Sequence, residues 1–132
     1  MGQDEDRLRR IVSSGGPFED VYGYSRAVRV GGQVHVSGTT AQPPHLDGVD
    51  AYEQAKAALA IIEAALREAG SSMAAVVRTV TYVTDMTDAE LVARAHREAF
   101  AQVRQAATLV EVSRLLGPQM KVEIEVYAVE PD

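Results

Sequence analysis

The chain has 132 residues, a formal net charge of −6 and no cysteine. A chain of this length can bury a core without disulfides or a structural metal, so one domain spanning residues 1–132 is expected. The lack of cysteine excludes thiolate nucleophiles and cysteine-ligated zinc, and it is compatible with a reducing compartment. No apolar stretch approaches the roughly 20 residues that span a bilayer, and scattered arginines in an acidic chain disfavour nucleic acid. We therefore expect a cytoplasmic protein that binds neither membrane nor nucleic acid.

The N-terminal part is predicted to hold one short strand and a loop. Met1 to Asp6 are polar and charged without periodicity, and we expect them to form a frayed leader. A strand is predicted around Arg9 to Val12. The segment Ser13 to Val21 is rich in Ser, Gly and Pro, which is typical of a loop.

The clearest local signal is a β-hairpin. Gly31-Gly32 suits the positive φ angles of a two-residue turn, and the flanking segments Ala27 to Val30 and Gln33 to Ser37 have strand composition. In that register Val28 and Val30 share one face with His35, while Val34 and Val36 lie on the other. Both faces of the hairpin therefore carry apolar side chains that need to be covered.

A loop over Gly38 to Gly48 leads to the first predicted helix. Asp50 with Glu53 three residues later forms a capping box, and Gly70 suits the helix end. Apolar residues recur at alternating steps of three and four along one face, which predicts an amphipathic helix. They are Tyr52, Ala55, Leu59, Ile62, Leu66 and Ala69.

The second half repeats the alternation of strand and helix. Val76 to Thr84 is β-branched and aromatic and predicts a strand. Thr87 and Glu90 form a second capping-box pattern, which opens a predicted helix through about Val103. Its apolar stripe consists of Val92, Ala95, Ala99 and Val103. Two further strands are predicted over Thr108 to Val112 and Val122 to Val129.

The predicted order is therefore β-β-β-α-β-α-β-β, an α+β fold with a six-stranded mixed sheet. Two helices can cover only one face of such a sheet. Self-association through the other face is the expected solution.

Five short segments, in this order and spacing, resemble the Rid (YjgF, endoribonuclease L-PSP-like) family over nearly the whole chain. They are Gly23-Tyr24, Val36-Ser37-Gly38, Val77-Arg78-Thr79 with Tyr82-Val83 and Asp85, Val110-Glu111-Val112, and Val122-Glu123-Ile124-Glu125. The resemblance implies a chorismate-mutase-like fold with the two helices on one face of the sheet. It also implies a homotrimer with small-molecule clefts at the subunit interfaces.

The resemblance further implies a site and a chemistry. The best-known branch hydrolyses enamines and imines derived from amino acids to a ketoacid and ammonia, without metal or organic cofactor. Carried over by position, the cleft tyrosine is Tyr24, the serine of the Ser-Gly turn is Ser37 beside Gly38, and the acid that orients or activates water is Glu123. A neighbouring hydroxyl is retained as Thr108.

Other positions depart from the pattern of that branch. Its carboxylate-binding arginine falls on Ala107, its cleft asparagine on Ala93 and its usual cysteine on Leu109. Alanine cannot replace the bidentate, charge-assisted clamp that an arginine gives a carboxylate. The chain is therefore expected to belong to a divergent branch. Three arginines are candidates to compensate, each with an ordinary surface or helix-end role as the alternative: Arg104, Arg26 and Arg114.

Each candidate residue has a structural alternative. Glu123 shares one strand face with Glu125 and Tyr127, as in any half-buried strand. It serves either as a water-activating acid or in a structural role, as a solvated edge residue or in a salt bridge between subunits. Glu125 is expected to be structural. Tyr24 either closes the cleft or packs at an interface, and Ser37 lacks the partners of a nucleophilic triad and is expected to bind ligand.

The histidines do not form a metal motif. His35, His45 and His96 are 10 and 51 residues apart without the spacing of a helix site, so no metal is expected. His96 lies on the turn that contributes a cleft aromatic in relatives and is a ligand-binding candidate, although a lone histidine more often serves packing.

Two functions remain open, and a third is disfavoured. The first is a hydrolase or deaminase of imine-like or other small metabolites that lack the usual α-carboxylate, with Glu123 activating water. The second is a non-catalytic metabolite-binding trimer, a sensor or scavenger. Retained Glu123 favours the first, whereas Ala107 and Ala93 favour the second. RNA cleavage is disfavoured, because the acidic chain offers neither a basic track nor an acid–base pair.

Overall fold

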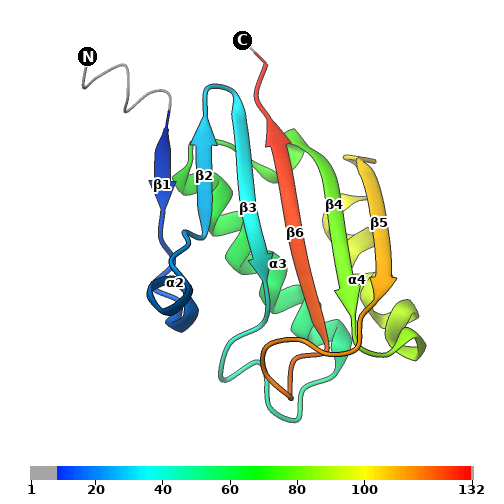
Figure 1. The fold of residues 1–132 in the computed structure, drawn as a ribbon. Coiled ribbons are helices and arrows are strands. Elements are labelled where there is room, and N and C mark those ends of the chain that lie inside the picture. Colours follow the sequence, from blue (N-terminus) through cyan, green and yellow to red (C-terminus); the bar gives the residue numbers. More distant parts are fainter. Residues whose placement is uncertain (1–8, 132) are drawn as a thin grey trace.

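A computed structural model describes residues 9–131 and shows an α+β fold built on one six-stranded sheet (Figure 1). The predicted leader, Met1 to Asp6, lies outside the described residues. The strands are β1 (Arg10–Val12), β2 (Ala27–Val30), β3 (Gln33–Thr39), β4 (Val76–Val83), β5 (Ala106–Glu111) and β6 (Val122–Val129). The helices are α2 (Pro17–Tyr22), α3 (Ala51–Glu68) and α4 (Ala89–Phe100), with 3₁₀ turns η1 (Met73–Ala75) and η2 (Met86–Asp88).

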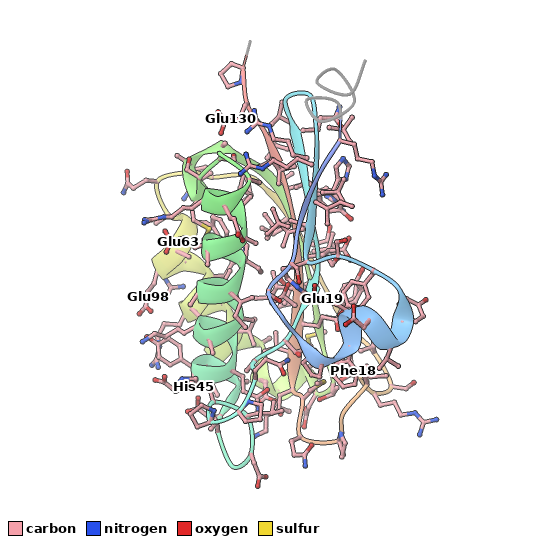
Figure 2. All side chains as sticks on the ribbon, turned by 90° about the vertical axis from the view of Figure 1, so that its left-hand side faces the viewer. Phe18, Glu19, His45, Glu63, Glu98 and Glu130 are labelled. Atoms are coloured by element: carbon pink, nitrogen blue, oxygen red, sulfur yellow. The ribbon has the colours of Figure 1, made fainter. Side chains whose placement is uncertain are left out.

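The sheet is mixed, as predicted, with the strand order β1-β2-β3-β6-β4-β5. Only β4 and β5 run parallel, and the connection between them is α4. The last strand, β6, inserts between β3 and β4 and pairs antiparallel with both. Helices α3 and α4 lie together on one side of the sheet, which Figure 2 shows edge-on. The predicted fold class and the covering of one face by two helices are therefore confirmed.

The hairpin has the predicted register, with Val28 opposite His35 and Ala27 opposite Val36. Each glycine of its turn is required for a different reason. Gly31 has a positive φ of 57°, which disfavours side chains. A Cβ on Gly32 would lie 2.6 Å from the carbonyl oxygen of Glu130, so only glycine fits there.

The core lies between the sheet and the two long helices. The predicted stripe of α3 is buried except at Tyr52, which is partly exposed, and Ile62 and Leu66 are fully enclosed. The stripe packs against the inward-facing residues of β3 and β6. On β6 these are Val122, Ile124, Val126 and Ala128. The residues of β6 that lie between these consequently point to the opposite face of the sheet, which no long helix covers.

Three local predictions need correction. The predicted loop over Ser13 to Val21 contains α2, which starts at Pro17, where a proline suits the first helical turn, and ends at Tyr22, followed by the capping residue Gly23 with a φ of 88°. The second long helix does not begin with the predicted capping box of Thr87 and Glu90. Instead, the Asp85 side chain accepts a hydrogen bond from Thr87 N, and η2 precedes α4. It ends at Phe100, before the predicted Val103, and β5 begins earlier than Thr108.

Within residues 9–131, no helix is both long and apolar enough to cross a bilayer.

Candidate functional site

A small cleft of about 60 Å³ lies where the α2 segment meets β3 and β6. Its lining combines polar groups with aliphatic and aromatic surface. The polar lining residues are Ser14, Tyr24, Arg26, Thr39, Thr40, Gln42 and Glu123, and the others are Gly16, Pro17, Phe18, Gly38, Ile61, Leu116 and Met120. Three of the residues predicted for the site, Tyr24, Gly38 and Glu123, therefore meet in one place.

Glu123 contributes a half-buried carboxylate from β6. In the described part of the chain, this carboxylate has no hydrogen-bond or ion-pair partner. Burial raises its pKa above the ordinary value, the nearby Glu125 raises it further, and the Arg26 charge opposes both effects. An acid with this environment can accept and return a proton closer to neutral pH than an exposed glutamate.

Gly38 makes room for that carboxylate. A Cβ on Gly38 would lie 2.6 Å from Glu123 Oε2 and 2.9 Å from Cδ, closer than non-bonded atoms approach. The register of β3 against β6 shifts between Val36 and Thr39, and Gly38 sits in this irregular stretch. The glycine of the Ser-Gly turn therefore lets the carboxylate lie flat against the backbone.

Glu125, two residues along the same face, has a different environment. Its carboxylate accepts hydrogen bonds from the hydroxyls of Tyr82, at 2.5 Å, and of Tyr127. The hydrogen bond to Glu125 is the main reason that the pKa of Tyr82 is raised to about 12. Glu125 is thus occupied by protein donors, in keeping with the structural role expected for it, whereas Glu123 is free.

Arg26 is a buried residue of the cleft, so its expected surface role is wrong. Only 6% of it is exposed. Its Nη1 donates to the carbonyl oxygen of Gly38 at 2.8 Å and to Thr39 Oγ1 at 2.7 Å, while Nη2 donates to the Tyr24 hydroxyl at 2.9 Å. Arg26 therefore fixes Tyr24 and the Gly38 backbone relative to each other.

Glu19 lies behind Arg26 and offsets its charge. Glu19 Oε2 is 3.9 Å from Arg26 Nε, and the same carboxylate accepts from the Ser13 and Ser14 hydroxyls and from the backbone N–H groups of Ser14 and Gly16. Burial tends to raise the pKa of Glu19, but these hydrogen bonds outweigh it and lower the pKa. The Glu19 carboxylate, labelled in Figure 2, thereby attaches the α2 segment to the sheet.

Ser37 does not line this cleft. Its hydroxyl donates to the carbonyl oxygen of Ser25 at 2.7 Å, and its backbone N–H donates to the Arg26 carbonyl oxygen. In the structure, Ser37 therefore connects the hairpin to the preceding loop, and its neighbour Gly38 lines the cleft instead.

Thr108 and His96 lie at a second hollow, of about 220 Å³, between α4 and β5. Ala93 and Ala107, the positions at which the sequence departs from the pattern expected from the resemblance, line it too, together with Thr81, Val92 and Leu109. Since β4 separates β5 from β6 in the sheet, one chain does not bring this hollow to Glu123.

The polar group of the second hollow is a small hydrogen-bonded cluster. His96 Nε2 lies 2.9 Å from Thr79 Oγ1 and 3.0 Å from Gln105 Nε2. Burial lowers the pKa of His96, which favours the neutral ring at physiological pH. Thr108 projects its hydroxyl toward the open face of the sheet, where it accepts from Arg78 Nη2 at 3.1 Å.

The other candidate cations lie elsewhere. Arg104 has a positive φ of 60° and lines a separate hollow with Arg97 and Gln105, and Arg114 is exposed in the loop before β6. No group of three His, Cys, Asp or Glu side chains that could hold a metal ion occurs in residues 9–131.

Sequence reasoning missed Glu19 and Gln105 and misplaced Arg26. Glu19 and Arg26 are recognised only because their charged side chains are buried. The burial of a residue in a loop leaves no periodic signal in the sequence.

Comparisons with known proteins agree with this architecture. A family model described as Endoribonuclease L-PSP matches residues 18–130. The Streptomyces coelicolor protein SCO2049 is 38% identical over 122 residues, which cover 90% of each chain.

Solved structures of similar proteins superpose along the chain. Rv2704 from Mycobacterium tuberculosis, described as a member of the highly conserved YjgF/YER057c/UK114 family, is 45% identical with a TM-score of 0.86 and covers 92% of this chain and 99% of its own. TdcF from E. coli, solved with bound serine, is 25% identical with a TM-score of 0.74 over 92% of this chain and 94% of its own. The chain belongs to the Endoribonuclease L-PSP (YjgF/Rid) family of small-molecule-binding proteins.

Proposed function

We propose that the protein is a cytoplasmic, cofactor-independent hydrolase of imine-like small metabolites, acting as a homotrimer with its pockets between subunits. The observation that carries this proposal is the free, half-buried carboxylate of Glu123 facing a cleft. An unpaired charge in such a place has no structural partner to explain it, and buried charges without partners cluster at functional sites.

The trimer is supported by the face of the sheet that α3 and α4 leave uncovered. Apolar side chains of five strands project from it, and several are well exposed. They are Ile11, Val28, Val30, Val80, Val110 and Val129. An apolar surface of this extent favours association, and packing of subunits would bring the hollow at Ala107 and His96 of one chain to the Glu123 cleft of another.

The chemistry requires little beyond the groups in the cleft. Glu123 accepts a proton from water as the water oxygen bonds to the imine carbon, and it returns this proton to the nitrogen to give a carbinolamine. In a second transfer Glu123 takes the hydroxyl proton and passes it to the nitrogen as the C–N bond breaks, so that a carbonyl compound and ammonia leave. Tyr24 supplies a polarising donor, because its oxygen already accepts from Arg26 Nη2 and its own O–H is free to donate to the cleft.

A non-catalytic metabolite-binding trimer is the second candidate. Ala107 and Ala93 favour it, since the hollow that they line lacks the polar groups of the related deaminases. TdcF with bound serine shows that a similar protein holds a small metabolite. RNA cleavage remains disfavoured, because the free carboxylate of Glu123 and the net charge of −6 both repel phosphate.

Activity assays distinguish these functions. Imines generated by an amino-acid oxidase should be hydrolysed negligibly, because Ala107 leaves their carboxylate without a clamp, and an Ala107→Arg variant should gain activity. Screening of carboxylate-free imines should reveal turnover that Glu123→Gln reduces by about 100-fold or more. Glu63→Gln, on the outer side of α3, is the matched control. Equal activity of the wild type and Glu123→Gln would contradict a catalytic Glu123 and favour the binding function.

A further inference from the structure

The charges in the cleft indicate which ligands it selects. We propose that the cleft takes a cationic ligand with planar N–H donors, namely a small aliphatic imine in its protonated form, held on the Glu123 carboxylate. This inference rests on the proposed function for its reaction, but the ligand class is tested by binding alone.

Among residues 9–131, Arg26 is the only cation that lines the cleft, and it offers no open pair of parallel N–H groups. A guanidinium clamps a carboxylate with two parallel N–H groups, either from Nη1 and Nη2 or from Nε and Nη2. Nη1 is engaged by Gly38 and Thr39, and Nε is fully enclosed without a hydrogen-bond partner. Neither pair is therefore open to an entering anion.

The charge of Arg26 is also offset from behind. Glu19 lies 3.9 Å from Nε in a pocket where both side chains are more than nine-tenths buried. With Glu19 and Arg26 compensating each other, ionised Glu123 leaves the cleft with a net negative charge. An anionic ligand would meet repulsion there, and a cation would meet the attraction that the low-dielectric surroundings strengthen.

The lining of the second hollow itself carries no full positive charge. None of its seven lining residues is a lysine or an arginine, and burial favours the neutral form of His96. Arg97 and Arg104 line the neighbouring hollow at the end of α4, which shares His96 with the second hollow. A subunit that placed the second hollow against the cleft would add hydroxyls and apolar surface from Thr108, Leu109 and Ala107, and it would bring Arg78, whose Nη2 donates to Thr108 at 3.1 Å, to the rim of the site.

The remaining lining fits the body of such a ligand. Phe18, Ile61 and Met120 supply apolar surface around the free carboxylate, which suits a short branched alkyl chain. A protonated imine presents its N–H in the plane of the C=N bond, and a carboxylate accepts from such a cation with a charge-assisted hydrogen bond. Stabilising the protonated form also activates the carbon toward water, because a cationic imine is the better electrophile.

Isobutyramidine and isobutyrate form a matched pair of probes, since they have the same branched body and planar head but opposite charge. Titration calorimetry with the full-length protein at pH 7 should show isobutyramidine binding at least about tenfold more tightly than isobutyrate. Glu123→Gln should weaken the amidine by about tenfold or more. Glu63→Gln, whose side chain lies on α3 away from the α2 segment (Figure 2), should leave it unchanged.

Carboxyl carbon NMR of the glutamate-labelled protein gives a second readout. Isobutyramidine should lower the pKa of Glu123 and leave the pKa values of the other glutamates unaffected.

Three results would each overturn the inference. They are isobutyrate binding equal to or tighter than that of isobutyramidine, amidine binding that is insensitive to Glu123→Gln, and binding of neither probe at millimolar concentration. Failure to find any hydrolysed imine would instead refute the proposed reaction, while a charge-selective binding result would stand. Turnover that depends on Glu123 but requires a carboxylate on the substrate would support the proposed reaction and refute the selection of cationic ligands.

Discussion

Gly38 and Glu123 form a pair in which the absence of one side chain sets the position of the other. A Cβ at position 38 would clash with Glu123 Oε2 and Cδ at 2.6 and 2.9 Å. Gly38→Ala should therefore displace the carboxylate and lower the free energy of unfolding by about 1 kcal/mol. In a Glu123→Ala background the clash is absent, and the same change should be neutral or stabilising by about 0.5 kcal/mol. Urea unfolding of the four proteins gives the coupling energy. Equal effects in both backgrounds would show that the two residues do not constrain each other.

The raised pKa of Glu123 predicts how the stability of the fold depends on pH. Because burial and Glu125 raise its folded-state pKa above 4.5, the fold favours the protonated form. The resulting contribution to stability is present below pH 4.5 and is lost as the pH rises through the folded-state pKa. Glu123→Gln should therefore match the wild type in acid and exceed it at pH 7, by about 0.5 kcal/mol because the group is only half-buried. Chemical unfolding between pH 4 and 8 measures this difference, and a variant less stable than the wild type at pH 7 would contradict it.

At the scale of elements, Gln54 joins α3 to two loops. Its side chain is fully buried. Nε2 donates to the carbonyl oxygens of Leu46, Val49 and Gln119 at 3.0–3.1 Å, and Oε1 accepts from Lys121 N at 2.9 Å. Gln54→Leu keeps the size of the side chain but leaves these backbone groups unsatisfied, so it should cost about 2–4 kcal/mol.

Gln102→Leu is the matched control, because Gln102 is exposed after α4 and its replacement should change stability by less than about 0.5 kcal/mol. Thermal and urea unfolding of both variants would measure the difference. Similar stabilities of the two variants would mean that the loops are held by other contacts.

At the scale of the whole molecule, the uncovered face of the sheet predicts the homotrimer. Sedimentation at micromolar concentration should give three times the chain mass of 14.2 kDa. Val80→Lys introduces a charge on that face, opposite Glu125 in the β4–β6 pair, and should dissociate the trimer. Ala64→Lys, on the exposed side of α3, should leave it intact. A wild-type species of 14 kDa would contradict both the trimer and a site between subunits.

Local patterns in the sequence determined the elements of the fold. The period of apolar residues over α3, the alternation over β6 and the Gly31-Gly32 turn each depend on neighbours in the chain, and all three were predicted correctly. The α2 helix was missed because its six residues are too few for a periodic pattern.

The site was decided by contacts that are distant in sequence. Gly38 meets Glu123 only because β6 pairs with β3 across 85 positions, and Arg26 is buried only because Glu19, Tyr24 and Gly38 converge on it. Sequence identified Tyr24, Gly38 and Glu123 through a family resemblance, but it could not show which charges are paired. Pairing depends on the distances between folded segments, and those distances set whether a buried charge is compensated or free to bind a ligand.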